Sequence, residues 1–221
     1  MCIRDRSFID IFTELRAQDH DILAILISEK LSGTIASANQ ALELMPEEPV
    51  EIFDSHSTAM AMGFQVLAAA RAGEQGAKLA ECVEVARRAR ESTGVIFAVE
   101  TLEFLHRGGR IGGASRLLGT ALNIKPILEV TEEGVVEAVE RVRTRKKSLS
   151  RLVELLCERV KGRTPVHLAV LHANAPEEAR QLMEQAAEAL DPVETVLSTV
   201  SPVVGTHAGP GTVGLAYLAG M

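Results

Sequence analysis

Short runs of apolar and β-branched residues alternate along this chain with longer runs in which apolar residues recur every three or four positions. This alternation is typical of an α/β protein. The short runs predict strands at 22–28, 50–54, 95–100, 166–173 and 193–200. The amphipathic runs predict helices at 34–45, 57–73, 77–92, 146–160 and 175–190. Because strands and helices follow one another, we expect a mainly parallel sheet in the first part of the chain.

The segment 125–144 departs from this alternation. It indicates two strands joined around Glu133-Gly134, a turn signal that a purely parallel sheet would not contain. We therefore predict two α/β lobes of different style. The first is the remainder of an N-terminal lobe over 8–95, and the second is a C-terminal lobe with a mixed sheet over 96–221.

Composition limits the class of protein. The chain has 221 residues, of which 47% are hydrophobic and 24% charged, as in an ordinary globular protein. A net charge of −7 argues against a nucleic-acid partner, whose phosphates need lysine and arginine. The start MCIRDRSFID lacks the apolar core of a signal peptide, and no run of about eighteen apolar residues predicts a membrane span. We expect a cytoplasmic protein.

Cysteine and histidine spacing gives no indication of a metal site. Cys2, Cys82 and Cys157 lie far apart and form no CxxC or Cys/His pattern, so neither a disulfide framework nor a zinc site is predicted. The six histidines show no ligand spacing either.

SEKLSGTIASA, residues 28–38, is the first candidate for chemistry. A predicted strand runs into Ser32-Gly33-Thr34 and then into a helix. Open α/β sheets bind ligands at the carboxyl ends of their strands, and the free amides of a helix start suit an anion. An ordinary Ser/Thr helix cap is the alternative.

Basic residues cluster in two further segments. HRGGRIGGASRLLG, residues 106–119, places arginines around Gly108-Gly109, and an arginine fork suits a carboxylate or phosphate. In ERVRTRKK, strand alternation would put Arg141, Arg143 and Arg145 on one face, able to meet an acidic partner or a nucleotide. A solvated turn and a solvated face are the respective alternatives.

SPVVGTHAGPGTVGLAYL, residues 201–218, combines glycines with the single imidazole of His207. Glycines let a ligand approach the main chain, while Thr206 and Thr212 supply the other polar side chains, so we interpret the segment as a ligand wall. It also contains GxGxxG, but too close to Met221 for the rest of a dinucleotide-binding unit. We reject that interpretation.

The motifs, taken in order, resemble the DegV family of bacterial fatty-acid-binding proteins. They are KLSGTIASA, FDSHSTAMAMGF, TLEFLHRGGRIGGASRLLGTALNIKPIL, ERVRTRKKSL and SPVVGTHAGPGTVGLAYL. The resemblance implies a two-lobed α/β protein that holds one long-chain fatty acid between its lobes. It also implies a lipid-presenting subunit, not itself an enzyme, that offers the carboxylate to a fatty acid kinase for acyl-phosphate formation in phospholipid synthesis.

By the same resemblance, Ser32 binds the carboxylate, and Arg110 and His207 belong to the head-group network. Arg141 and Arg143 would meet the kinase. The loops that support the head group contain Gly33, Thr34, Thr206 and Gly209. The resemblance implies no metal, no cofactor other than the bound lipid, and no stable membrane insertion.

The start of the chain differs from the family pattern. An Asp-Ser turn after a first strand and a Thr-Ser-Gln-Pro-Ser loop, usual in the family, are not found. We therefore expect an N-terminally shortened chain in which residues 1–7 are foreign or disordered.

Two alternatives from other classes remain open. A serine-dependent esterase would use Ser32, His207 and Asp54, although the GxSxG elbow is missing. A sugar or dihydroxyacetone kinase, suggested by likeness of fold, would need a nucleotide site that the sequence does not reveal.

Overall fold

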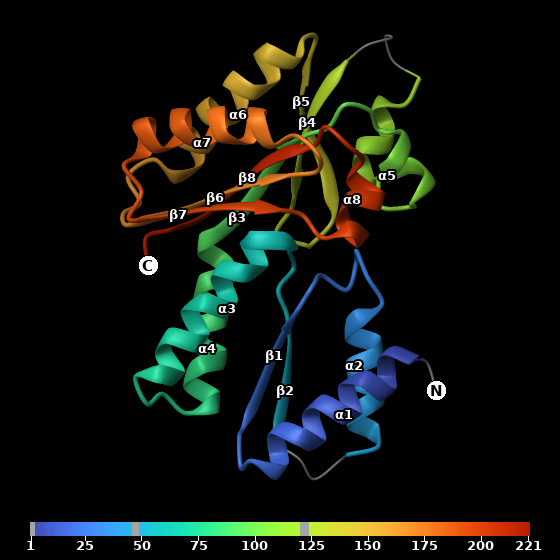
Figure 1. Ribbon diagram of the computed structural model, residues 1–221, viewed down its shortest axis with the longest axis vertical. Coiled ribbons are helices and arrows are strands. Elements are labelled where there is room, and N and C mark those ends of the chain that lie inside the picture. The colour runs from blue at the N-terminus through green and yellow to red at the C-terminus, as the bar shows by residue number, and fades with distance from the viewer. Residues whose placement is uncertain (1–2, 46–48, 120–123) are drawn as a thin grey trace.

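Two β-sheets organise the computed structural model, which describes residues 3–45, 49–119 and 124–221 (Figure 1). The first part of the chain forms α1 (Ile3–Ala17), β1 (Ile22–Leu26), α2 (Thr34–Glu43), β2 (Val50–Asp54), α3 (Ala59–Glu74), α4 (Leu79–Ser92) and β3 (Thr93–Ala98). The second part forms α5 (Glu103–Arg107), η1 (Gly112–Leu117), β4 (Lys125–Val130), β5 (Val136–Val142), α6 (Arg145–Val160), β6 (Val166–His172), α7 (Pro176–Leu190), β7 (Glu194–Thr199), α8 (Pro202–Ala208) and β8 (Val213–Ala219).

The smaller sheet pairs β1 with β2 in parallel, from Ile22 opposite Val50 to Leu26 opposite Asp54. Helices α1 and α2 pack on one face around Phe12. Helices α3 and α4 pack on the other face around Phe53. Because successive side chains of a strand point to opposite faces, the short apolar strands can supply both of these clusters.

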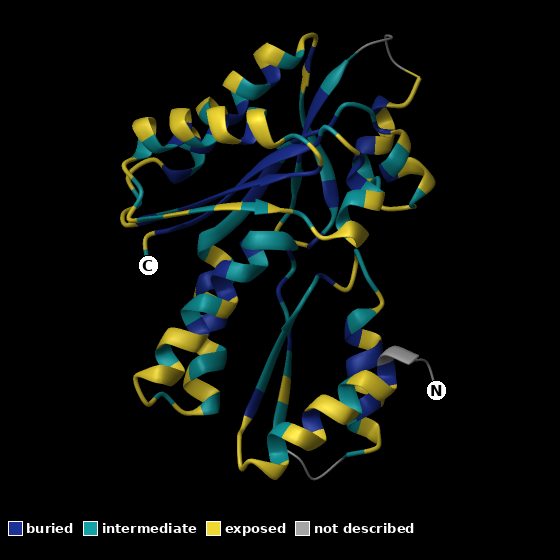
Figure 2. Cartoon of the chain, viewed as in Figure 1, coloured by how far each residue is buried: buried dark blue, intermediate teal, exposed yellow. Residues whose placement is uncertain are grey.

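The larger sheet has six strands in the order β5-β4-β3-β8-β6-β7. Its β6–β7 pair is parallel and the other pairs are antiparallel, so the sheet is mixed. Helices α6 and α7 cover one face, and α3 packs on the opposite face around Phe64. All seven residues of β8 are buried because this strand lies in the middle of the sheet, as the dark blue in Figure 2 shows.

Loops at the carboxyl ends of β1 and β2 contact the hairpin between β4 and β5. Ser28 Oγ donates to the Gly134 carbonyl at 2.8 Å, and His56 Nδ1 lies 2.8 Å from the Glu132 carbonyl oxygen. Gly134 has a φ of +80°, and a Cβ there would lie 2.2 Å from Ser28 Oγ. The hairpin predicted around Glu133-Gly134 is confirmed, and it joins the two sheets.

The N-terminal segment differs from the expectation. Residues 3–7, expected to be foreign or disordered, form the first turns of α1, because the helix gains a buried anchor in Phe12, which is 2% exposed. In the described part of the chain these residues are therefore helical, and their foreign origin stays a prediction. Residues 1–2, including Cys2, lie outside the described part of the chain.

The C-terminal segment, interpreted from its glycines as a ligand wall, forms regular secondary structure. Residues 201–218 fold into α8 and most of β8, and α8 contacts α5. The expected lobe boundary after residue 95 falls inside β3, which begins at Thr93 and belongs wholly to the larger sheet. None of the helices in the described residues combines the length and apolarity needed to cross a bilayer.

Candidate functional site

A cavity of about 260 Å³ lies between the loop after β1, the start of α3, the inner face of the larger sheet and α8. Its wall is mainly apolar. The apolar lining includes Val95, Phe97, Val130, Leu171, Val200 and Val204. The polar side chains on the wall are Ser32, Thr58, Arg110, His207 and Thr212. The volume is just below the roughly 300–1,000 Å³ that is typical of small-molecule sites.

Ser32 lies in the loop that connects β1 to α2. Helix α2 begins at Thr34 with Gly33 as its N-cap, and no side chain makes the capping hydrogen bond. The helix-cap alternative for Ser32 is therefore not observed. Instead, Ser32 lines the cavity, and its Oγ lies 2.8 Å from Thr34 Oγ1, a hydrogen bond that helps to orient the Ser32 hydroxyl for a polar ligand atom.

Arg110 follows α5 and reaches across to the loop after β1. Its Nε donates to the Leu31 carbonyl at 2.9 Å, and its Nη1 donates to the Gly108 carbonyl at 2.8 Å. In the described part of the chain, no carboxylate forms an ion pair with it. The guanidinium is thus held by two neutral acceptors next to Ser32, and its positive charge is left for a ligand.

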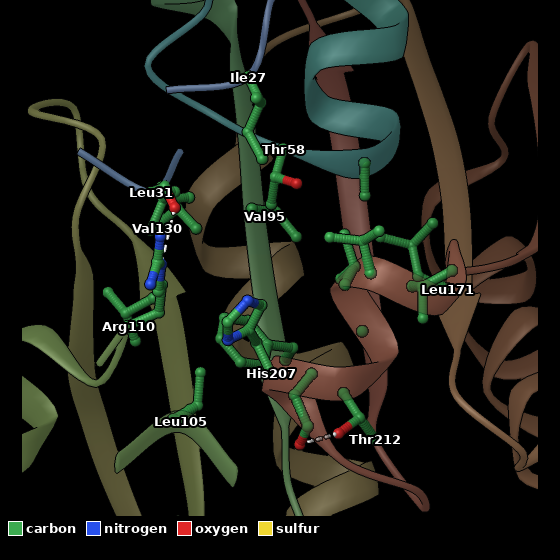
Figure 3. Close-up of a pocket in the computed structure, with 18 of the residues that line it drawn as sticks. Ile27, Leu31, Thr58, Val95, Leu105, Arg110, Val130, Leu171, His207 and Thr212 are labelled. Carbon is green, nitrogen blue, oxygen red and sulfur yellow. Dashed lines mark hydrogen bonds between the residues drawn. The ribbon is translucent and has the colours of Figure 1, made fainter. Parts of the chain in front are cut away.

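His207 lies in the last turn of α8, and its side chain contacts the residue that also accepts from Arg110. A Cβ added to Gly108 would lie 2.1 Å from His207 Nδ1, so only a glycine leaves room for the imidazole. Nδ1 is buried and has no hydrogen-bond partner among the described residues. Figure 3 shows His207 between Arg110 on one side of the cavity and Leu171 on the other.

Because Gly108 sets the position of the imidazole, we expect Gly108→Ala to displace His207 and to weaken ligand binding by about tenfold, the loss of one hydrogen bond to a charged group. Its backbone, with φ of −76°, tolerates alanine. Gly73→Ala is the matched control, because it lies in α3 away from this cavity and a Cβ there meets only Cys82 Sγ at an ordinary 3.7 Å. Equal affinities of the two variants, measured by titration with a fluorescent fatty acid, would contradict this assignment.

The other residues expected to support the head group lie in different settings. Thr206 is exposed and donates to the Pro202 carbonyl at 2.8 Å within α8, and it does not line the cavity. Gly209 has a φ of +83°, and a Cβ there would lie 2.4 Å from the ring of Phe104. It therefore permits the close contact between the end of α8 and α5.

Asp54 lies away from the cavity and is engaged elsewhere. Its two carboxylate oxygens accept from the backbone amides of Glu29 and His56 at 3.2 and 2.8 Å. Within the described residues no carboxylate contacts His207, whose Nδ1 has no partner. The structure therefore does not assemble the triad that an esterase would need.

The arginines after the hairpin divide into two groups. Arg141 and Arg143 are exposed on either side of buried Val142 at the edge strand β5. The expectation that Arg145 shares their face is wrong, because α6 begins there and turns its side chain inward. Arg145 donates to Glu178 and to the Gly211 carbonyl.

The sequence interpretation missed several parts of the wall. Thr58 at the start of α3 and Leu171 on β6 line the cavity, as does Val200. Apolar periodicity places such residues inside a protein but does not separate a cavity wall from a filled core. No group of His, Cys, Asp and Glu side chains in the described ranges could hold a metal ion.

Comparisons with known proteins agree on one family. A family model described as an uncharacterised protein of the DegV family matches residues 1–220. A DegV domain-containing protein of Clostridium perfringens is 36% identical over 215 residues, which cover 96% of this chain and 75% of the relative.

Solved structures give the same fold. A DegV family protein from Thermus thermophilus, described for its fatty acid binding, has a TM-score of 0.91 at 34% identity and covers 97% of this chain and 76% of its own. DegV of Bacillus subtilis, described as a fatty acid binding protein, has a TM-score of 0.85 at 32% identity, with coverage of 97% and 76%. This chain has the α/β DegV fold, and it belongs to the DegV family.

Proposed function

We propose that this protein binds a long-chain fatty acid in the 260 Å³ cavity, with the carboxylate at Ser32, Arg110 and His207. One observation carries the proposal. The wall of a mainly apolar cavity has a hydroxyl, a guanidinium with no carboxylate partner and an imidazole whose Nδ1 has no hydrogen-bond partner among the described residues, and these come from three distant parts of the chain. Both similar solved proteins are described as binding fatty acids, which supports the same ligand class.

The polar side chains suit a carboxylate. An ionised carboxylate is costly to remove from water unless hydrogen bonds replace its hydration. Arg110 can donate through Nη2, the imidazole of His207 through Nδ1, and Ser32 through its hydroxyl. Because Arg110 and His207 both contact Gly108, and Arg110 also contacts Leu31 next to Ser32, these donors converge on one end of the cavity.

The apolar side chains suit the tail. The wall extends from the head-group residues along the face of the larger sheet on which α3 packs, and it includes Val95, Phe97, Leu171 and Val200. Each methylene removed from water contributes roughly 0.8 kcal/mol, so the tail supplies most of the affinity. The polar groups then determine the orientation of the chain, with the carboxylate towards Arg110 and the methyl end towards Leu171.

We further propose that the bound carboxylate is presented to a partner kinase, which forms the acyl-phosphate used in phospholipid synthesis. Arg141 and Arg143 are exposed at the sheet edge, where an acidic surface of a partner can reach them. The phosphoryl transfer belongs to the partner. We place this step in the cytoplasm, where thiols such as Cys82 and Cys157 stay free.

The organic extract of the purified protein tests the binding proposal directly. Mass spectrometry should find about one unmodified fatty acid per chain, because the apolar wall retains the tail during purification. Protein purified after exchange into a lipid-free buffer with a hydrophobic resin provides the empty control. A chain that yields no fatty acid and takes up neither palmitate nor oleate would overturn the proposal.

A further inference from the structure

A second, larger cavity of about 570 Å³ lies where two strands of the larger sheet separate. Val95 opposite Val130 is the last pair between β3 and β4. Beyond this pair, Thr93 and Gly94 continue to pair with β8, while the chain after Val130 turns into the hairpin. The cavity occupies the gap, and Val95 and Val130 separate it from the apolar cavity, since they line both.

The half-buried charged side chains of this second cavity include three arginines and one carboxylate, Glu129. Arg159 is neutralised by Glu129 at 2.6 Å. Arg90 and Arg163 have no carboxylate partner within the described ranges. Arg90 donates to the Asp54 carbonyl and stacks over Phe53, and Arg163 donates to the Arg159 carbonyl and stacks over Tyr217.

The acidic residues of the rim do not neutralise these two arginines. The other carboxylates of the lining, Glu91, Glu132 and Glu133, are exposed to solvent. His56 also lies on the rim, where its Nδ1 is 2.8 Å from the Glu132 carbonyl oxygen. The cavity therefore has two positive charges inside without partners and its negative charges outside, an arrangement that attracts an anion.

Gln65 adds a requirement for a donor group on the ligand. Its Nε2 donates to the Ser55 carbonyl at 3.1 Å and to Thr93 Oγ1 at 3.2 Å, which fixes the orientation of the amide. Its Oε1 is buried and has no hydrogen-bond partner in the described part of the chain, although buried polar atoms are nearly always paired. A ligand hydroxyl would satisfy this oxygen.

Tyr217 completes the polar lining. Its hydroxyl lies over Gly94, where a Cβ would be only 2.6 Å from the oxygen. None of the hydrogen bonds among the described residues uses this hydroxyl, so it is also available to a ligand. Glycine at residue 94 thus leaves space for a polar group on the wall of the cavity.

We propose that this second cavity is a binding site for a small anion that carries hydroxyl groups, such as a phosphorylated polyol or a hydroxycarboxylate. The anionic group lies at Arg90 and Arg163, and a hydroxyl group donates to Gln65. The site does not depend on the fatty acid, because its polar residues are separate from Ser32, Arg110 and His207.

Calorimetric titration with three probes tests the site. Glycerol 3-phosphate combines both chemical features, inorganic phosphate has only the charge, and glycerol has only the hydroxyls. We expect saturable binding of glycerol 3-phosphate, at least tenfold weaker binding of phosphate, and no measurable binding of glycerol. Equal affinities for glycerol 3-phosphate and phosphate would contradict the role of Gln65, and absence of binding by both would overturn the site.

Variants locate the bound probe. Arg90→Met and Arg163→Met each keep an apolar side chain for the aromatic stacking, and each should weaken glycerol 3-phosphate binding about tenfold to a hundredfold. Arg87→Met, on the exposed face of α4, is the matched control and should have no effect. Circular dichroism shows whether each variant is folded. If one of the two cavity variants does not fold, the other still tests the site.

The content of fatty acid should be unchanged in these variants, which separates this site from the proposed fatty-acid site. A competing occupant is the second carboxylate of a long dicarboxylic lipid, whose chain would pass from the apolar cavity between Val95 and Val130. Titration with hexadecanedioate and palmitate distinguishes it. Tighter binding of hexadecanedioate that is lost in Arg163→Met, together with no binding of glycerol 3-phosphate, would overturn the proposal in favour of that lipid.

Discussion

Replacing His207 with alanine should lower the affinity for a fatty acid about tenfold to a hundredfold. The imidazole Nδ1 is buried and has no partner among the described residues, so a bound carboxylate would be its hydrogen-bond partner. Loss of a hydrogen bond to a charged group costs about 1.5 to 3 kcal/mol. The apolar lining is unchanged, so weaker binding of the tail should remain measurable by displacement of a fluorescent fatty acid.

His207→Gln distinguishes a hydrogen-bond donor from a catalytic base. Glutamine keeps a donor of similar reach, so affinity should stay within a few-fold of wild type. A catalytic base would behave differently, because glutamine cannot transfer a proton and both variants would then lose ester turnover equally. Equal affinities in all three proteins would end the head-group assignment. Ester hydrolysis that disappears in both variants would favour the esterase instead.

If the proposed kinase partner binds at Arg141 and Arg143, reversing the charge of both residues should abolish acyl-phosphate formation while the lipid content stays the same. Both side chains are exposed, and the buried Val142 between them keeps them on the outer side of β5. Like charges placed against an acidic partner surface cost several kcal/mol, enough to prevent a transient complex. The measurement is transfer of labelled phosphate from ATP to the bound fatty acid.

A matched double variant controls for net charge. Arg88→Glu with Lys161→Glu changes the total charge by the same amount on exposed residues of α4 and of the turn after α6. This variant should keep full phosphorylation. Loss of bound fatty acid in the Arg141 and Arg143 variant would instead show that these residues affect the cavity, and normal phosphorylation in it would remove them from the kinase interface.

Local pattern was sufficient for most of the secondary structure. Helices α2, α3, α4, α6 and α7 and strands β1, β2, β6 and β7 follow from period and composition alone, whereas α1 and α5 were not predicted. The Glu133-Gly134 turn also determined the hairpin, because glycine permits the positive φ that the turn requires. Its antiparallel strands β4 and β5 followed from that signal.

The C-terminal segment was harder to predict for a physical reason. The glycines of 201–218 indicated a ligand wall and gave no signal for a strand, yet β8 lies inside the larger sheet, between β3 and β6. Its strand conformation is stabilised by pairing on both edges and by helices on both faces, and these partners are distant in sequence. Short α8 depends in the same way on its contact with α5.

The sequence by itself determined the α/β class, the hairpin and, through the order of its motifs, the family, and it predicted Ser32, Arg110 and His207 as site residues. Tertiary structure alone decided that these three side chains line one cavity, that Gly108 makes room for the imidazole, and that Arg145 turns away from Arg141 and Arg143. Local periodicity predicts on which face of its own helix or strand a side chain lies. Cavities and convergent donors arise from segments that meet only after the chain has folded, so their geometry has no local signal.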